Sequence, residues 1–319
     1  MTYENINQII EKVVRNIESV IIGKRDIAEL SLVALLAEGH VLLEDVPGVG
    51  KTMMVRALAT SISASFSRIQ FTPDLLPSDV TGTSIFDPRT QEFIFRPGPI
   101  MGNIVLADEI NRTSTKTQAA LLEGMEEASI TVDGITRKLE QPFFVMATQN
   151  PIEYEGTYPL PEAQLDRFLL KMRMGYPHPQ EEIDILDNVQ ASHPIDRLEP
   201  VISIQDVRDL QSEAKAIYVD HSIKQYIVNI AGKTREDARV YLGASPRGSI
   251  ALMRAGQAYA LIQGREYVIP DDIQYLAPYV FSHRIILKPE ARYGGVETEE
   301  LVSSLLEKVP VPVQRLVKK

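Results

Sequence analysis

One short segment, DVPGVGKT at 45–52, constrains this chain more than any other. It follows an apolar run that predicts a buried strand over 40–44, and it precedes a predicted helix over 52–62. Glycines at positions 48 and 50 let the backbone turn so that successive N–H groups face one point, and the start of a helix adds partial positive charge. Strand, glycine-rich turn, Lys-Thr pair and helix together predict a phosphate-binding loop.

In such a loop Lys51 reaches the β- and γ-phosphates of a nucleotide, and Thr52 is a ligand of Mg²⁺. Asp45 departs from the usual G-x-x-x-x-G-K-T spacing, because it occupies the position of the first glycine. A carboxylate would repel phosphate there, so the prediction requires the Asp45 side chain to point away. The alternative, an ordinary glycine-rich turn, does not account for the strand, the Lys-Thr pair and the helix occurring together.

A second candidate element is a predicted buried strand over 103–108 that ends in the carboxylate pair Asp108 and Glu109. We expect Asp108 near Mg²⁺, usually through water, and Glu109 near a water molecule that a hydrolase must activate. An apolar run ending in Asp-Glu is common by itself. It gains specificity here as the partner of a phosphate loop that precedes it by two strands.

Three further polar residues are candidates for the same chemistry. Asn150 follows a predicted strand over 142–148 and is placed to hold the attacking water or the γ-phosphate, although an Asn-Pro pair also ends strands without any such role. Arg167, in AQLDRF, and Arg247, in ASPRG, are isolated arginines that could stabilise transition-state charge on a phosphate. Their spacing alone is equally consistent with surface salt bridges.

The order of predicted elements indicates an α/β fold followed by helices. The predicted strands, which include one over 66–71, alternate with predicted helices. This alternation favours a parallel sheet covered on both faces. Two hairpins interrupt this order, at 84–96 and at 129–139, where an Asp-Gly pair suits a type I′ turn. The strand pattern ends after about Gly175, so we predict an α/β domain over 1–190 and a smaller helical domain over 191–319.

Composition excludes several classes of site and partner. The chain has 319 residues, a formal net charge of -10 and no cysteine, so thiolate nucleophiles, disulfides and Cys-ligated metals are ruled out. The acidic balance argues against a uniformly basic surface that would bind nucleic acid or an anionic membrane, and it leaves a local basic channel open. The first residues lack a signal-peptide pattern, and no apolar stretch approaches the ~20 residues of a membrane span, which favours a cytoplasmic location.

With these elements in order, the chain resembles the MoxR family of AAA+ ATPases over essentially its whole length. The resemblance is carried by six segments: VLLEDVPGVGKT (41–52), RIQFTPDLLPSDVTG (68–82), LADEINR (106–112), QAALLEGMEE (118–127), ATQNP (147–151) and PLPEAQLDRF (159–168). The family's loop also lacks the first glycine. The resemblance implies a P-loop NTPase fold with β-hairpin inserts and a C-terminal α-helical lid, ATP and Mg²⁺ as ligands, and a ring that is normally a hexamer.

The resemblance also implies roles for individual residues. Asp108 and Glu109 match the Walker B pair, Asn150 looks like sensor 1, Arg167 looks like an arginine finger for the ATP of a neighbouring subunit, and Arg247 looks like sensor 2. The residues implied to bind the nucleotide are Ile22, Gly23, Pro47, Gly48, Val49, Gly50, Lys51, Thr52 and Met53.

The family suggests chaperone-like remodelling of protein complexes, with partners that contain von Willebrand factor A domains. The alternatives are a chelatase-type motor subunit that serves a metal-inserting partner and a nucleic-acid-dependent AAA+ motor.

Overall fold

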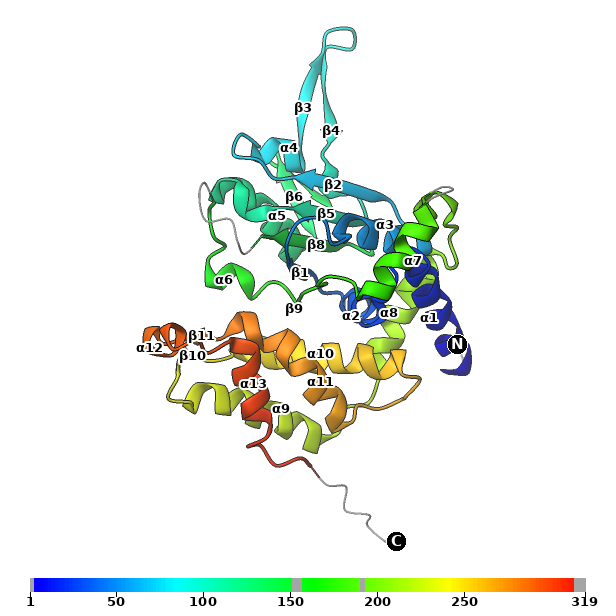
Figure 1. Ribbon diagram of the computed structural model, residues 1–319. Helices are drawn as coiled ribbons and strands as arrows, with labels where there is room; N and C mark the ends of the chain where they lie inside the picture. The colour runs from blue at the N-terminus through cyan, green and yellow to red at the C-terminus, as the bar shows by residue number, and fades with distance from the viewer. Residues whose placement is uncertain (1–2, 151–156, 190–192, 313–319) are drawn as a thin grey trace.

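The computed structural model describes residues 3–150, 157–189 and 193–312 (Figure 1). Its strands are β1 (Val41–Glu44), β2 (Phe66–Gln70), β3 (Gly82–Asp87), β4 (Glu92–Pro97), β5 (Ile104–Asp108), β6 (Ser129–Val132), β7 (Ile135–Lys138), β8 (Phe144–Gln149), β9 (Leu170–Met172), β10 (Val240–Leu242) and β11 (Ile286–Leu287). Its α-helices are α1 (Tyr3–Glu18), α2 (Arg25–Leu36), α3 (Lys51–Ser61), α4 (Pro77–Thr81), α5 (Thr115–Glu127), α6 (Glu162–Leu165), α7 (Pro179–Val189), α8 (Ile204–Ala216), α9 (His221–Glu236), α10 (Pro246–Ile262), α11 (Pro270–Phe281), α12 (Pro289–Tyr293) and α13 (Thr298–Leu306).

A five-stranded parallel sheet in the order β2-β5-β8-β1-β9 forms the centre of the α/β part. Four of its strands lie where the sequence predicts them. The fifth, β9, is not predicted, because three residues with a lysine in the middle form neither an apolar run nor a readable alternation. It pairs with β1, and the Lys171 ammonium lies 3.2 Å from the carboxylate of Glu44 at the end of that strand.

The two faces of this sheet belong to two different hydrophobic clusters. In β1, Val41 and Leu43 join the cluster that includes α3 and the lid helices, whereas Leu42 joins the cluster under α5. Because successive side chains of a strand point to opposite faces, strands that are apolar at every position are buried on both sides. The layered α/β architecture expected from the sequence is confirmed.

Two antiparallel hairpins leave this body at the places that the sequence predicts. β3 and β4 form a ribbon that projects away from the sheet (Figure 1), and β6 and β7 form a shorter hairpin beside its base. Asp133 and Gly134 join β6 to β7 with φ angles of 53° and 73°. Positive φ at both central residues is what a type I′ turn requires, so that prediction is confirmed.

The C-terminal part is helical but not entirely so. Helices α9 to α13 lie below the sheet in Figure 1, and β10 pairs with β11 to make a small antiparallel sheet among them. The prediction that strands end after about Gly175 is therefore wrong; segments of three and two residues are too short to show a period. The predicted boundary between residues 190 and 191 lies outside the described residues. Within the described ranges, no helix is long and apolar enough to cross a membrane.

The His40 side chain ties the start of β1 to helix α5 and to strand β8. Its ring Nε2 lies 3.0 Å from the backbone oxygen of Met125 on α5, and its Nδ1 accepts a hydrogen bond of 3.1 Å from the backbone N–H of Val145 on β8. The ring is neutral in this arrangement, with the proton on Nε2. Complete burial lowers the pKa of His40 to about 4.

This burial predicts a loss of stability in mild acid. The pKa of the His40 ring is 6.5 in the unfolded chain and about 4 in the folded protein, so below pH 6.5 the unfolded chain binds a proton that the folded protein does not. The contribution of this group to the free energy of unfolding is therefore fully present above pH 6.5 and is lost as the pH falls toward 4. Over the range from pH 7.5 to 5.5, we expect this group to lower the free energy of unfolding by about 1 kcal/mol for each pH unit below 6.5. His40→Gln should be less stable at pH 7.5 but show a smaller drop. The exposed His221→Gln is the control, and an equal drop in all three proteins would contradict the prediction.

Candidate active site

The loop between β1 and α3 has the geometry that a phosphate-binding loop needs. Gly48 and Gly50 have φ angles of 88° and 94°, a conformation that side chains larger than hydrogen disfavour. A methyl group at Gly48 would meet no atom within 4 Å, so the backbone there faces open space. The Lys51 ammonium donates to the backbone oxygens of Asp45, at 2.8 Å, and Val46, at 3.2 Å. The loop therefore has open space at Gly48, and its lysine ammonium is held against the loop backbone.

Asp45 points away from this loop, as the sequence analysis requires. One of its carboxylate oxygens accepts hydrogen bonds from the backbone N–H groups of Met174, at 2.6 Å, and Gly175, at 2.8 Å. The other accepts from the N–H of Val46 at 3.0 Å. The buried carboxylate thus joins the loop to the end of β9, and its charge is directed at backbone donors rather than at the open side.

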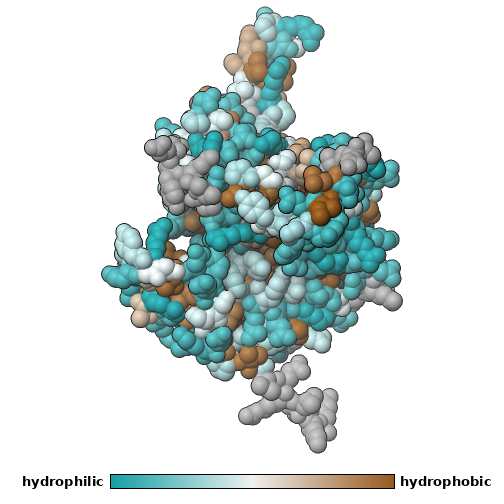
Figure 2. Space-filling view, viewed as in Figure 1, coloured by the Kyte–Doolittle hydropathy of each residue, from teal (hydrophilic) through white to brown (hydrophobic). Residues whose placement is uncertain are grey.

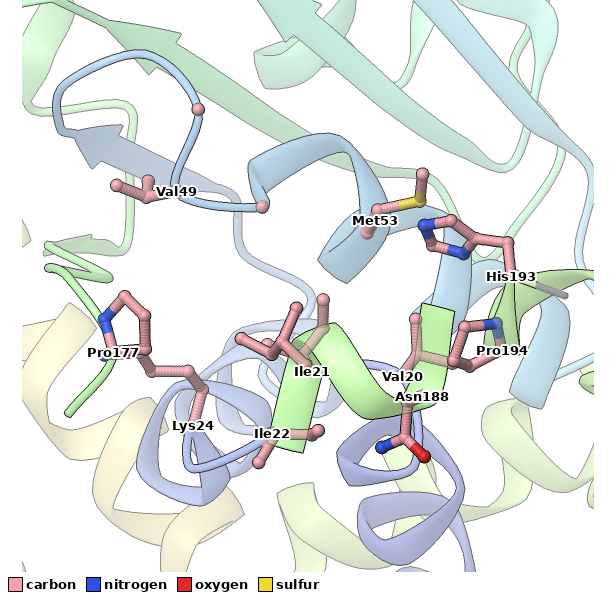
Figure 3. A pocket seen from close by; sticks show the side chains of 13 residues that line it. Val20, Ile21, Ile22, Lys24, Val49, Met53, Pro177, Asn188, His193 and Pro194 are labelled. Carbon is pink, nitrogen blue, oxygen red and sulfur yellow. The ribbon is translucent and has the colours of Figure 1, made fainter. Parts of the chain in front are cut away.

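A cavity of about 230 Å³ beside the loop is lined mainly by apolar side chains. Val49 and Met53 lie above Ile21 in Figure 3, with Pro177 towards one end and His193 towards the other. A mainly apolar pocket suits an aromatic base. Ile22, one of the residues implied to bind the nucleotide, lines this cavity.

Gly23 does not line this cavity; it makes the bend that follows α1. Its φ angle is 72°, and a methyl group there would lie 2.0 Å from the carboxylate of Glu181 on α7. The nucleotide-binding role implied for Gly23 stays a prediction.

A second cavity of about 410 Å³ adjoins the first at the loop and collects the predicted chemical residues. It shares Gly48, Gly50 and Met53 with the apolar cavity of about 230 Å³. The other residues that line it are Pro47, Lys51, Thr52, Arg68, Gln70, Asp108, Glu109 and Asn150. Segments that are about a hundred residues apart meet here because the carboxyl ends of parallel strands lie at one edge of the sheet.

Thr148 contacts both residues of the Asp-Glu pair, the first through its carboxylate and the second through its backbone. Its hydroxyl donates to Asp108 at 2.7 Å and accepts from the backbone N–H of Glu109 at 2.8 Å. Glu109 has a left-handed backbone, with a φ of 58°, and its carboxylate accepts a hydrogen bond of 2.8 Å from the Gln70 side chain. The second Asp108 oxygen forms an ion pair of 2.6 Å with Arg68.

The oxygen donors of this cavity suit Mg²⁺. A hydroxyl from Thr52 and a carboxylate from Asp108 line the same space as Lys51. Mg²⁺ usually takes one or two protein oxygens and completes its shell with water and phosphate, so a cluster of three or more acidic side chains is not needed. The described residues contain no such cluster.

The two candidate arginines lie together in a different cavity of about 200 Å³. Arg167 donates to the backbone oxygen of Leu122 at 2.6 Å and forms an ion pair of 3.0 Å with Glu126. Arg247, in the first turn of α10, forms an ion pair of 3.3 Å with the same Glu126. Among the described residues, this cavity and the one at the phosphate loop share no lining residue. Neither arginine therefore faces the phosphate loop of its own chain.

Comparison with known proteins places these features in a family. Residues 40–170 match the ATPase family associated with various cellular activities (AAA), and residues 232–305 match its lid domain. The chain is 42% identical to Chaperone MoxR1 of Mycobacterium tuberculosis, over 95% of this chain and 82% of that protein. The chain belongs to the MoxR family of AAA+ ATPases. It is also 66% identical to an uncharacterised protein, YeaC, of Bacillus subtilis, over 98% of both chains.

Solved structures agree with this MoxR-family fold. The crystal structure of a candidate ATPase from Cytophaga hutchinsonii is 37% identical and superimposes with a TM-score of 0.92, covering 98% of this chain and 97% of that one. The parallel sheet flanked by helices and the helical lid are therefore those of an AAA+ P-loop NTPase.

Three polar residues of the MoxR-family site were not singled out from the sequence. These are Arg68, Gln70 and Thr148, which contact the carboxylates of Asp108 or Glu109. A signal for two of them is present in the sequence, since Arg68 and Gln70 are two residues apart in β2 and so share a face. The register that places Gln70 beside Asp108 becomes known only when β2 is paired with β5.

Proposed function

We propose that this protein hydrolyses ATP in the presence of Mg²⁺. The observation that supports the proposal is one cavity in which a phosphate-loop lysine, a Thr-Asp pair of oxygen ligands, a second carboxylate and an asparagine meet. The apolar cavity that continues from it has the size and lining for the adenine base. ATP spanning the two would place its phosphates over Gly48 and Gly50.

Each residue of the chain then has a distinct task. Lys51 and the first N–H groups of α3 bind the phosphates and offset their charge. Thr52 and Asp108 would hold the metal, which supplies charge stabilisation at the phosphate oxygens. Glu109, whose carboxylate Gln70 keeps at the cavity wall, orients and polarises the attacking water, and Asn150 fixes the water or the γ-phosphate.

The assignment of Glu109 predicts that hydrolysis can be lost while binding persists. Glu109→Gln keeps the size of the side chain but cannot accept a proton, so we expect turnover to fall by about 10² to 10⁴ with ATP affinity nearly unchanged. Phosphate release and calorimetric titration measure the two quantities. Glu123→Gln, an exposed change on α5, is the control, and a Glu109→Gln protein that hydrolyses ATP at the wild-type rate would contradict the assignment.

We propose that the active unit is a closed ring, by family resemblance a hexamer. Arg167 and Arg247 lie in a cavity separate from their own phosphate loop, so they serve hydrolysis only if they meet the nucleotide of another subunit. Contacts in which one face of a subunit meets a different face of the next generate rings when they close. Arg284 supports the arrangement, since its buried guanidinium binds Asp166 at 2.6 Å and the backbone oxygen of Phe168 at 2.6 Å, on either side of Arg167.

We propose further that the ring remodels other proteins, and the β3–β4 hairpin supports this. Its side chains Phe86 and Phe93 pack with ring centroids 5.4 Å apart, yet they are 49% and 74% exposed. Ile85 and Ile94 on the opposite face of the ribbon are also exposed, and Figure 2 shows apolar residues on this projecting element. An exposed apolar patch of this kind marks a contact with protein rather than with nucleic acid.

Capture from an extract of the source organism compares the protein and nucleic-acid alternatives. Glu109→Gln protein with bound ATP should retain a client protein, and adding Phe86→Ser and Phe93→Ser should release it while ATP binding persists. Glu92→Gln on the same hairpin is the control. Recovery of nucleic acid alone would favour the motor alternative, and recovery of a metal-inserting complex would favour the chelatase alternative.

Three further parts of the proposal rest on the sequence and on the family that it resembles. They are partners with von Willebrand factor A domains, a cytoplasmic location, and domain limits of 1–190 and 191–319.

A further inference from the structure

One carboxylate, that of Glu126, contacts both candidate arginines in the cavity that Arg167 and Arg247 share. One of its oxygens lies 3.0 Å from Arg167 and the other lies 3.3 Å from Arg247. The two arginines come from different parts of the fold, the segment before β9 and the first turn of α10. Glu126 itself belongs to the last turn of α5, where a negative charge is unfavourable to the helix dipole. Its position therefore costs the helix some stability and is compensated by the arginines.

The helix that carries Glu126 is fixed to the hydrolytic carboxylates at its other end. α5 begins after the short turn that follows Glu109, and the buried Gln118 side chain donates to the backbone oxygens of Ile110, at 3.1 Å, and Thr113, at 3.3 Å, in that turn. A third hydrogen bond of 2.9 Å reaches the backbone oxygen of Tyr158. One rigid helix thus runs from the phosphate cavity to the arginine cavity of the same chain.

Charge explains what Glu126 does there. Four guanidinium groups line the cavity, those of Arg167, Arg247, Arg254 and Arg284. Arg284 is paired with Asp166, which also lies 4.0 Å from Arg247, whereas Glu126 approaches both Arg167 and Arg247 and so offsets their mutual repulsion. Each guanidinium has five N–H donors, so contact with one carboxylate leaves other donors for a phosphate.

We propose that Glu126 is a positioning residue that orients Arg167 and Arg247 as one unit toward the γ-phosphate bound by a neighbouring subunit. The proposal rests on the ring and arginine-finger parts of the proposed function. Without the carboxylate the repulsion between the two cations is no longer offset, and Arg167 and Arg247 are not held together where charge develops in the transition state. Because α5 also joins the turn after Glu109, Glu126 links the occupied or empty state of one site to the arginines presented to the next.

Kinetics of the assembled protein test this role. Glu126→Gln removes the charge but keeps the length, and we expect kcat to fall roughly 10- to 100-fold, the range for a small misplacement of catalytic groups, with the KM for ATP unchanged. Glu126→Asp keeps the charge and should recover part of the loss. Glu127→Gln, the neighbouring exposed change at the end of α5, should behave as wild type and controls for the helix-end charge.

A double-mutant cycle separates positioning from general destabilisation. If Glu126 acts through Arg247, then adding Glu126→Gln to Arg247→Gln should lower kcat little further, with ring assembly and thermal stability unchanged. Independent, multiplying losses would overturn the proposal, as would a wild-type kcat for Glu126→Gln. Measuring Arg167→Ala alongside distinguishes a failure of the proposed arginine finger from a failure of the role of Glu126. If Arg167→Ala keeps full turnover, the proposed arginine finger is wrong. If Arg167→Ala loses turnover and Glu126→Gln does not, only the role of Glu126 is wrong.

Discussion

Lys51→Ala is expected to weaken ATP binding by at least about 100-fold. The ammonium is the cation that the loop itself supplies to the phosphate cavity, and it also bridges the backbone oxygens of Asp45 and Val46. The substitution removes charge-assisted hydrogen bonds to the phosphates, each worth about 1.5–3 kcal/mol, and loosens the loop that presents its N–H groups. Calorimetric titration of the purified protein with ATP and Mg²⁺ measures the loss directly.

Two comparisons make the Lys51 result specific. Lys116→Ala, on the exposed start of α5, changes the net charge by the same amount and should leave ATP affinity unchanged. Thermal unfolding without nucleotide should show that Lys51→Ala remains folded. Wild-type ATP affinity in a folded Lys51→Ala protein would refute the assignment of the loop.

Arg167→Ala is expected to keep ATP binding and to lose about 10³-fold in turnover, the lower end of the range for arginine fingers. The binding cavities of the same chain are lined by other residues, so affinity should not change. In the assembled protein, the neighbour's nucleotide would lose the cation that stabilises charge on the transferred phosphoryl group. Phosphate release at saturating ATP measures the effect.

Mixing two inactive proteins tests whether Arg167 acts between subunits. An Arg167→Ala subunit retains Glu109, and a Glu109→Gln subunit retains Arg167, so one interface of a mixed ring has a complete site. We expect partial recovery of turnover on mixing. Arg15→Ala, in which an arginine that is 75% exposed on α1 is removed, is the control for loss of a surface charge. Unchanged turnover in assembled Arg167→Ala, or a loss that mixing never restores, would remove the between-subunit assignment.

Much of the fold was predictable because its signals are local. Three of the longer strands of the sheet, β1, β5 and β8, are largely apolar runs, and the phosphate loop is marked by glycines that have the positive φ angles the turn needs. The Asp133-Gly134 turn was predictable for the same reason. The short strands β9, β10 and β11 were not, since two or three residues carry no period and are extended only because a neighbouring strand pairs with them.

Single residues show the same limit. Ile250 is an apolar residue of α10, yet its side chain is 49% exposed and it lines the arginine cavity. The buried side of that helix instead uses small residues such as Ala251 and Ala255, where other helices pack closely. A helical period shows that a helix has one apolar side, and the elements packed against the helix decide which of its positions are buried.

The sequence by itself determined the nucleotide chemistry of this protein, because turn, lysine, hydroxyl and helix start are contiguous in DVPGVGKT and their geometry is set by local backbone conformation. Only the tertiary structure shows where the two candidate arginines lie. Glu126, Arg167 and Arg247 are separated by 41 and 80 residues, and no local pattern relates them. Packing of α5 and α10 around the segment before β9 brings their charges within hydrogen-bonding reach and away from the chain's own phosphate loop.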